Sequence, residues 1–572
     1  MPGPLLATKN PAPRLRICCY ITSLMRPRFK VVLLILATFA ALILLHLPLL
    51  GLPYFWDEAG YYIPAALDFY RAGLLIPIST LPVGHPPLVM IYLGLVWRIF
   101  GFSPWVTRAA MTLIAAATVV SLYTLGRRVA SREIAAWSAL LLALSPLFFA
   151  QSTLVHLDLA AALFTTLAVL FLLEDRIWVF AQAASLAVLS KETSVVLLPV
   201  VWVYAWRKNR QRAGERGASV PAWAALAAPL APLAVWALYY HYATGYWTGN
   251  SEYLSYNLYS TLSPARIFWS LMRRVYELFA GGFNWLLSIS IPLGFWWGRK
   301  REGRDTGIGG RETGHGGRNT GIGTRESGNE NGDSRSGVST YPVSRIPCPD
   351  SEPPPWRQFI FLTAGLMAIY LLLLSVAGGA ILPRYLLPVL PLFYLVGVAL
   401  LMRLPCFPAR LICAAAAACF IWAWFINPPY PFPFEDNLAY ADFVRLHKHA
   451  ARYLEAQYGE PRILTAWPAT DELTRPILGY VRKPLRVVTV RGFAPGELEG
   501  APPEAFDLLY FYSRKWEPPG NWVARFPYWL RTQERQFDYH PQIAAADLAA
   551  RYHLKLLAEF EQRGQWVRIY SH

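Results

Sequence analysis

The chain has 572 residues, of which 55% are hydrophobic and only 16% are charged, with a formal net charge of +17. An average soluble protein carries about 25% charged residues, so this composition excludes an ordinary soluble enzyme and indicates a polytopic membrane protein. The positive charge fits cytoplasmic loops rich in Lys and Arg. No basic motif for binding nucleic acid stands out, so nucleic acid is not expected as a partner.

The first apolar run, residues 31–50, carries no charge and is long enough to cross a bilayer as a helix. Segment 1–30 is basic and should therefore remain in the cytoplasm, which places Asp57 and Glu58 outside. Segment 86–101 is short for a span, begins with two prolines and contains an arginine. We expect it to lie in the membrane interface, so that residues 51–104 form one external catalytic loop.

Apolar segments then alternate with polar ones up to residue 427, which predicts a transmembrane domain over residues 31–427 with about eleven helices. The chain should lie in the inner (plasma) membrane, with a cytoplasmic N-terminus and an external, periplasmic C-terminal domain. The spans expected after the first are 105–126, 134–150, 159–173, 177–190, 193–206, 222–242, 285–298, 359–377, 385–402 and 410–427.

Two segments differ in composition from these spans. Residues 299–357 contain a seven-residue Arg/Thr/Gly repeat without an apolar face, which predicts a disordered cytoplasmic insert. A glycine-rich phosphate loop is disfavoured, because no Gly-Lys-Ser/Thr occurs there. Residues 428–572 have the composition of a soluble α/β domain, expected on the external face. Its predicted elements are a helix at 439–458, strands at 462–467, 485–490 and 507–512, and a terminal hairpin at 553–560 and 565–570.

Ionisable residues gather at the predicted external ends of the spans. Such groups are costly at membrane depth and usually mark a pathway or a site. Each alone could be structural, since a lysine can snorkel and an arginine can anchor at headgroups. Together they indicate a site for an anionic, lipid-linked substrate. The residues are Asp57, Glu58, His85, His156, Asp158, Lys191, Glu192, Arg384 and Tyr385.

Several motifs occur in an order that resembles a known family. They are Tyr54-Phe-Trp-Asp57-Glu58, His85-Pro-Pro-Leu, Leu125-Gly-Arg-Arg, Leu144-Ser-Pro-Leu-Phe, Leu157-Asp158, Leu189-Ser-Lys191-Glu192 and Arg384-Tyr-Leu-Leu-Pro388. This series resembles the GT-C membrane glycosyltransferases, and within them the protein O-mannosyltransferases and the lipid A aminoarabinose transferases. The resemblance covers about residues 50–200 and, by a shorter motif, 380–395; it does not cover the tail.

The resemblance implies a polyprenyl-phosphate sugar as donor, Asp57 as the catalytic base, and interfacial helices in the first external loop. The leaving group is already a phosphate, so cations rather than an acid are needed to stabilise it. Arg384 has a planar guanidinium that can bind a phosphate with two hydrogen bonds, and Lys191 adds a compact positive charge. Asp57 would deprotonate the acceptor hydroxyl and the anomer would be inverted. The sequence differs from the family's usual residues at His85, where the aminoarabinose branch has Lys, and at Glu192, where small residues are commoner.

The candidate site residues are therefore Asp57, Glu58 and Asp158 for catalysis, and His85, Lys191, Arg384 and Tyr385 for binding the lipid phosphate and sugar. No cofactor is expected, and no metal is predicted, although a divalent ion could bind at Asp57 and Glu58. The acceptor would be a hydroxyl of a protein, a lipid or a glycan. A secondary transporter or a non-catalytic lipid-binding membrane protein are the alternatives, since buried acids and bases also line transport pathways.

Overall fold

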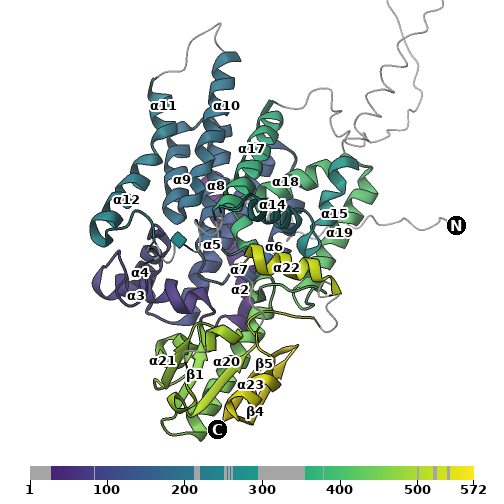
Figure 1. The fold of residues 1–572 in the computed structure, drawn as a ribbon. Helices are drawn as coiled ribbons and strands as arrows, with labels where there is room; N and C mark the ends of the chain where they lie inside the picture. The colour runs from purple at the N-terminus through teal and green to yellow at the C-terminus, as the bar shows by residue number, and fades with distance from the viewer. Residues whose placement is uncertain are drawn as a thin grey trace, which may run out of the picture.

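The protein consists of a helical part and a C-terminal domain built on a β-sheet, which adjoin one another (Figure 1). The computed structural model describes residues 27–82, 84–211, 220–249, 251, 254–255, 258, 262–293, 354–377, 379–498, 501–518, 525–537 and 542–572. The predicted insert 299–357 lies outside the described residues, except for its last four, which belong to helix α17. Most of the predicted cytoplasmic segment 1–30 also lies outside them.

Helix α5 runs through the helical part and packs against α2, α6 and α8. Among the described residues, three helices are long and apolar enough to cross a membrane by length and composition: Phe29–Leu49, Pro104–Val129 and Trp356–Val376. The total of eleven spans stays a prediction. The main helices of this part are α2 (Pro27–His46), α3 (Ile63–Ala72), α4 (Leu88–Phe100), α5 (Pro104–Val129), α6 (Arg132–Leu144), α7 (Pro146–Gln151), α8 (Leu157–Leu173), α9 (Ile177–Ser190), α10 (Leu197–Gln211), α11 (Val220–Ala227), α12 (Leu230–Thr244), α14 (Pro264–Phe279), α15 (Trp285–Ser288), α17 (Pro354–Val376), α18 (Leu390–Leu401) and α19 (Cys406–Ala423).

Some predicted spans are divided in the structure. The apolar run 134–150 forms α6 and α7, because Ser145 precedes Pro146 and adopts an extended ψ of 136°. The run 222–242 forms α11 and α12. Helix α14 lies between the predicted spans 222–242 and 285–298, and its buried residues Arg266, Ser270 and Arg274 follow one another at helical spacing.

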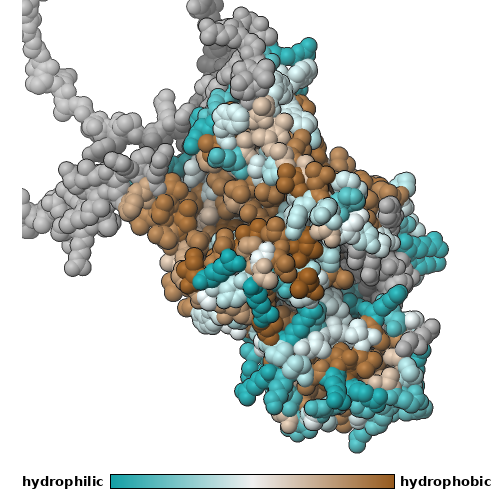
Figure 2. All heavy atoms as spheres, turned by 90° about the vertical axis from the view of Figure 1, so that its left-hand side faces the viewer, coloured by the Kyte–Doolittle hydropathy of each residue, from teal (hydrophilic) through white to brown (hydrophobic). Residues whose placement is uncertain are grey.

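The outer surface of the helical part is largely apolar. Figure 2 shows hydrophobic side chains gathered on the face of the helical part in view, whereas hydrophilic side chains are more frequent on the C-terminal domain. Exposed leucines on α2, such as Leu36 and Leu44, contribute to this band. An apolar surface of this extent indicates contact with lipid. The structure thus agrees with a membrane-embedded protein that carries a polar domain.

The predicted external loop 51–104 contains two helices, α3 and α4, that pack against each other. Helix α4 has 13 residues, which is short for a membrane span at 1.5 Å rise per residue. This length agrees with the interfacial interpretation, which stays a prediction.

The C-terminal domain has a five-stranded sheet in the order β2-β1-β3-β5-β4. Strand β1 is parallel to β2 and β3, and β5 pairs antiparallel with β3 and β4. The predicted helix and all five predicted strands are present. Helices α22 and α23 were not predicted, and α22 packs against α14 of the helical part. The bounds are α20 (Ala439–Gln457), β1 (Arg462–Ala466), α21 (Ala469–Thr474), β2 (Arg486–Val490), β3 (Leu508–Tyr512), α22 (Pro527–Phe537), α23 (Ala545–Tyr552), β4 (Lys555–Gln562) and β5 (Gln565–Ser571).

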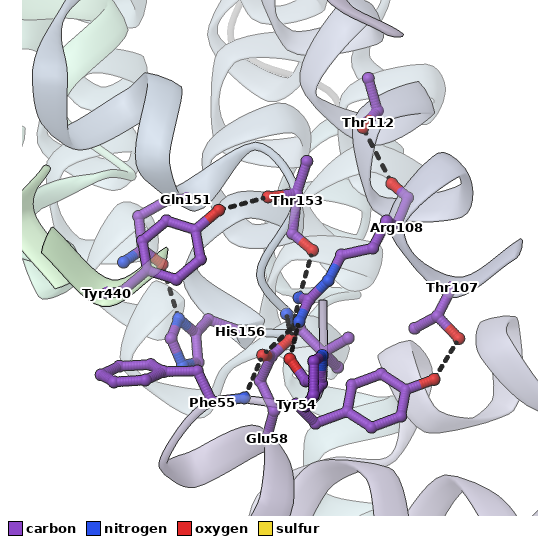
Figure 3. Close-up of polar contacts among 12 residues, drawn as sticks. Tyr54, Phe55, Glu58, Thr107, Arg108, Thr112, Gln151, Thr153, His156 and Tyr440 are labelled. Carbon is purple, nitrogen blue, oxygen red and sulfur yellow. Dashed lines mark hydrogen bonds and ion pairs between the residues drawn. The ribbon is translucent and has the colours of Figure 1, made fainter. Parts of the chain in front are cut away.

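Hydrogen bonds hold the domain against the predicted external loop and the α7–α8 connection. The Tyr480 hydroxyl donates to the carbonyl of Tyr54 at 3.0 Å. The hydroxyls of Tyr440 and Thr153 share a hydrogen bond of 3.0 Å (Figure 3). These contacts are buried, so the domain and the loop form one continuous structure.

A buried ion pair between Glu58 and Arg108 fixes the start of the external loop (Figure 3). Both side chains are almost fully buried, with 0% and 1% exposed. The guanidinium donates to both carboxylate oxygens, at 2.5 and 3.0 Å. The backbone N–H groups of Phe55 and Val155 also donate to this carboxylate, at 2.8 and 2.6 Å. The pair therefore joins the loop, α5 and the α7–α8 connection.

We predict that Glu58→Gln destabilises the protein strongly. Removing one partner of a buried ion pair leaves an uncompensated charge, which typically costs about 3–5 kcal/mol. Chemical unfolding of detergent-purified protein would measure this. The matched control is Glu133→Gln, which breaks an exposed pair with Arg410 and should change stability by about 1 kcal/mol or less. Equal stabilities of the two variants would contradict a positioning role for Glu58.

The predicted topology can be tested with single cysteines at two exposed positions, Arg71 in α3 and Arg210 in α10. In a background lacking the six native cysteines, Arg71→Cys should react with a membrane-impermeant thiol reagent in intact cells. Arg210→Cys should react only after permeabilisation, because basic loops remain in the cytoplasm. Labelling of both in intact cells, or of position 210 alone, would overturn the predicted orientation.

Candidate functional site

Arg384 lies at the centre of a buried polar cluster where the helical part meets the C-terminal domain. Its side chain is 2% exposed. Nη2 donates to Oδ2 of Asp57, and Nη1 donates to Glu435 Oε2 and His156 Nε2, both at 2.7 Å. Nε lies 3.9 Å from Oδ2 of Asp158. The structure thus joins three predicted residues, Asp57, Asp158 and Arg384, and adds Glu435.

Asp57 is presented to the site by an unusual stretch of backbone. The preceding Trp56 has a φ of +44°, which is rare for a bulky residue, and the following residues Glu58–Tyr62 form a π-helical turn. Trp56 is held there by an edge contact with Trp467 and a tilted ring contact with Phe443, both of the C-terminal domain. Strained backbone of this kind is often found at functional sites. The Asp57 side chain remains 19% exposed.

Glu58, the other acid of the predicted pair, differs from Asp57 in its environment. Both of its oxygens accept hydrogen bonds in the buried pair with Arg108. Its geometry favours a positioning role rather than the catalytic role that the sequence suggested.

Asp158 and Lys191 form a buried ion pair, with Nζ 2.6 Å from Oδ1. Asp158 lies in the first turn of α8, where the helix dipole stabilises a negative charge. Lys191 directly follows α9. Its Nζ lies 3.9 Å from the centre of the Tyr385 ring, which is within range of a cation–π interaction.

Tyr385 is surrounded by three cations. Besides Lys191, the guanidinium carbons of Arg384 and Arg274 lie 5.4 and 5.9 Å from its ring centre. Arg274 is fully buried, and its Nη1 has no hydrogen-bond partner. It forms no ion pair with any residue that the structure describes. A buried, uncompensated charge is costly, so this group of cations is suited to bind an anion.

His85 and Glu192 contact each other, with Nδ1 2.9 Å from Oε2. These are the two positions at which the sequence differs from the usual residues of the family it resembles. Burial raises the pKa of Glu192, but His85 and Lys191 outweigh this and lower it to about 2. Glu192 directly follows Lys191 in the chain, so its contact with His85 places His85 next to the cluster.

His156 is a neutral acceptor in this site. Burial and the nearby cations Arg384, Lys191 and Arg108 hold its pKa well below the usual range. Gln151 Nε2 donates to the carbonyl of Glu435, so its Oε1 accepts from His156 Nδ1–H at 2.6 Å. His156 Nε2 is then left to accept from Arg384.

Sequence reasoning missed Arg274, Gln151 and Glu435. Arg274 could have been found, because Arg266, Ser270 and Arg274 form a polar stripe at helical spacing. Glu435 follows a proline-rich stretch at the start of the tail and carries no local signal. No group of three or more His, Cys, Asp or Glu suited to hold a metal ion occurs among the described residues. The guanidinium of Arg384 occupies the centre of the acidic cluster.

An aromatic pocket lies beside this cluster, between α3, α4 and α12. Its lining includes Tyr61, Tyr62, His85, Trp236 and Tyr240. The Tyr62 ring is also 6.0 Å from that of His156. Aromatic side chains with a few polar groups are typical of sites for small organic ligands.

Comparison with known proteins supports the resemblance found in the sequence. A family model described as dolichyl-phosphate-mannose-protein mannosyltransferase matches residues 84–236. None of the curated protein sequences compared with this chain matches it.

Solved structures give a match over nearly the whole chain. The crystal structure of ArnT from Cupriavidus metallidurans bound to undecaprenyl phosphate is 14% identical, with a TM-score of 0.51 over 94% of this chain and 97% of that one. Its apo state, also 14% identical, gives a TM-score of 0.50 over 95% and 98%. The archaeal oligosaccharyltransferase AglB from Archaeoglobus fulgidus is 11% identical, with a TM-score of 0.41 over 80% and 64%. The chain thus has the fold of ArnT, and its predicted resemblance to the GT-C membrane glycosyltransferases is confirmed.

Proposed function

We propose that this protein is a glycosyltransferase that takes a sugar from a polyprenyl-phosphate-linked donor. The sugar is transferred to an acceptor hydroxyl at the external, periplasmic face of the membrane, with inversion of the anomeric carbon. The fold shared with an ArnT structure that binds undecaprenyl phosphate supports a lipid-phosphate donor. The observation that carries the proposal is the contact of a partly exposed acid, Asp57, with Arg384 beside two further buried cations.

The cations form the donor-phosphate side of the proposed site. Arg384 and Arg274 can each offer a guanidinium N–H, since Arg384 Nε and Arg274 Nη1 are buried without hydrogen-bond partners. Lys191 adds a compact positive charge, and its pairing with Asp158 holds it in place. Hydrogen bonds from charged donors to phosphate are stronger than neutral ones, and they stabilise the charge that the leaving group gains in the transition state.

Asp57 forms the acceptor side. Its carboxylate takes the proton of the acceptor hydroxyl while that oxygen attacks C1 of the sugar. The bond between C1 and the phosphate oxygen breaks, and the polyprenyl phosphate leaves with the bonding electron pair. Because attack and departure occur on opposite faces, the anomeric configuration is inverted. The aromatic pocket beside His85 would hold the sugar or the acceptor against this centre.

The direct test is to incubate the purified protein with a panel of polyprenyl-phosphate sugars and candidate protein, lipid and glycan acceptors. Mass spectrometry should find one acceptor that gains the mass of one sugar, together with release of polyprenyl phosphate. Binding of the lipids without transfer from any of the sugars would favour the non-catalytic alternative.

We predict that Asp57→Asn retains donor binding but loses turnover about 10²–10⁴-fold, the usual effect of removing a general base. The amide is nearly isosteric, so the position of neighbouring groups should be kept. Turnover and donor affinity would be measured on protein that elutes as a single folded species. The control is Asp507→Asn, which alters an exposed pair with Arg462 and should leave turnover unchanged. Wild-type turnover in Asp57→Asn would remove Asp57 from the mechanism.

Adjacent arginines in α14 provide a matched test of the phosphate site. We expect Arg274→Gln to weaken binding of undecaprenyl phosphate about tenfold or more, because a hydrogen bond to a charged group contributes about 1.5–3 kcal/mol. Arg273 instead pairs with Glu277, so Arg273→Gln should change the affinity less than about threefold. Both affinities can be measured by titration of purified protein. Equal losses in the two variants would show that Arg274 has no specific role.

A further inference from the structure

Glu435 brings a carboxylate from the start of the C-terminal domain onto Arg384. It lies in a short helical turn, Phe434–Asp436, between α19 of the helical part and α20 of the domain. Its Oε2 accepts a hydrogen bond of 2.7 Å from Arg384 Nη1. Asp57 uses the other terminal nitrogen, Nη2. Both ends of the guanidinium fork are thus occupied by carboxylates of the protein itself.

The backbone around Glu435 is held from both sides. Its carbonyl accepts from Gln151 of α7, and the following Leu438 donates to the carbonyl of Trp424 at 3.2 Å. Phe434 is buried and lies 5.5 Å from the ring of Phe443 in α20. The carboxylate is therefore delivered to Arg384 by a fixed backbone, and only its side chain is free to rotate away.

The Glu435 carboxylate is nevertheless poorly compensated. Its second oxygen, Oε1, is buried without a hydrogen-bond partner. Burial raises the pKa of Glu435 to about 7; Arg384 opposes this rise, and the nearby carboxylates of Asp57 and Asp158 add to it. A buried acceptor that lacks a partner costs free energy, so this contact can be exchanged for a better one.

We propose that Glu435 is the resting counter-ion of Arg384, and that the phosphate of the lipid-linked donor replaces it at Nη1. This inference rests on the proposed function, because it assumes that Arg384 binds the donor phosphate. In the resting state Glu435 compensates the buried guanidinium. When the donor binds, its phosphate takes over that charge-assisted hydrogen bond, and the Glu435 carboxyl turns away or takes up a proton.

The charges around the site determine how donor binding depends on pH. Among the described residues, the carboxylates of Asp57, Asp158 and Glu435 stand against the cations of Arg384, Lys191 and Arg274, with His156 neutral. Asp436, which adjoins Glu435, has a pKa held well above its usual range by burial and by Glu435 and Glu277. A donor phosphodiester adds one negative charge, and protonation of Glu435 removes one. Donor binding should therefore become tighter as the pH falls through about 7.

The test uses undecaprenyl methyl phosphate, a diester whose single charge does not change near neutral pH. Its affinity for the purified full-length protein would be measured at about pH 8 and about pH 6, on either side of the Glu435 pKa. Wild-type protein should bind it several-fold more tightly at the lower pH. Glu435→Gln should bind about threefold or more tightly than wild type at the higher pH and lose most of the pH dependence. A merely structural role would weaken binding at both pH values.

Two further variants make the result specific. Asp436→Asn changes the adjacent buried acid, which has no described contact with Arg384, and should keep the wild-type pH profile. Arg384→Ala should lose binding at both pH values. If Arg384→Ala binds the lipid as wild type does, the proposed phosphate site itself is wrong. If Arg384→Ala loses binding but Glu435→Gln binds no more tightly than wild type at the higher pH, only the role of Glu435 is wrong. Should Glu435→Gln fail to fold, a wild-type affinity independent of pH would still overturn the inference.

Discussion

The buried guanidinium of Arg384 is the group around which the other elements of the site are arranged. A charge removed from water must be compensated by partners with good geometry. Here the partners come from separate parts of the chain: Asp57 from the first external loop, His156 and Asp158 from the start of α8, and Glu435 from the segment before α20. Displacing any one of these segments would leave a buried charge or acceptor unpaired. The cluster therefore fixes how loop, helical part and domain meet.

The neighbouring acids Asp57 and Glu58 show how one short motif serves two purposes. Glu58 is fully buried, and Arg108 and two backbone N–H groups bind its carboxylate and hold it in place. The backbone that this pair fixes turns the preceding side chain, Asp57, toward the partly open site. The proposed base, Asp57, must be held within a fraction of an ångström of its target, and the fixed position of Glu58 provides that precision. The buried and fixed Glu58 thus leaves Asp57 available to the site.

The sequence predicted most helices and all five strands because long apolar runs and alternating patterns depend on local physics. It failed where a proline divides a run, as at Pro146, and where an amphipathic helix, α14, has a buried polar face. Asp57, Asp158, Lys191 and Arg384 were found from their motifs, and the structure brings them together. Glu435 could not be found, because a carboxylate in a loop gains significance only from the tertiary contact that it makes. Its partner Arg384 lies 51 residues away in the sequence.

The C-terminal domain reaches the three cations of the site in different ways: the segment that leads into it pairs with Arg384, and its helix α22 packs against α14, which carries Arg274. Lys191 is compensated by Asp158 within the helical part, and Arg274 donates to the carbonyl of Leu374 in α17. Only Arg384 has a partner in the segment that leads into the domain. Because Tyr440 and Tyr480 of the domain also bond to the backbone and side chains around the external loop, a shift of the domain would move Glu435 and the loop together. Arg384 would then lose or regain its counter-ion. The hydrogen bond between Arg384 and Glu435 in this way links the position of the domain to the positive charge that the proposed donor phosphate would meet.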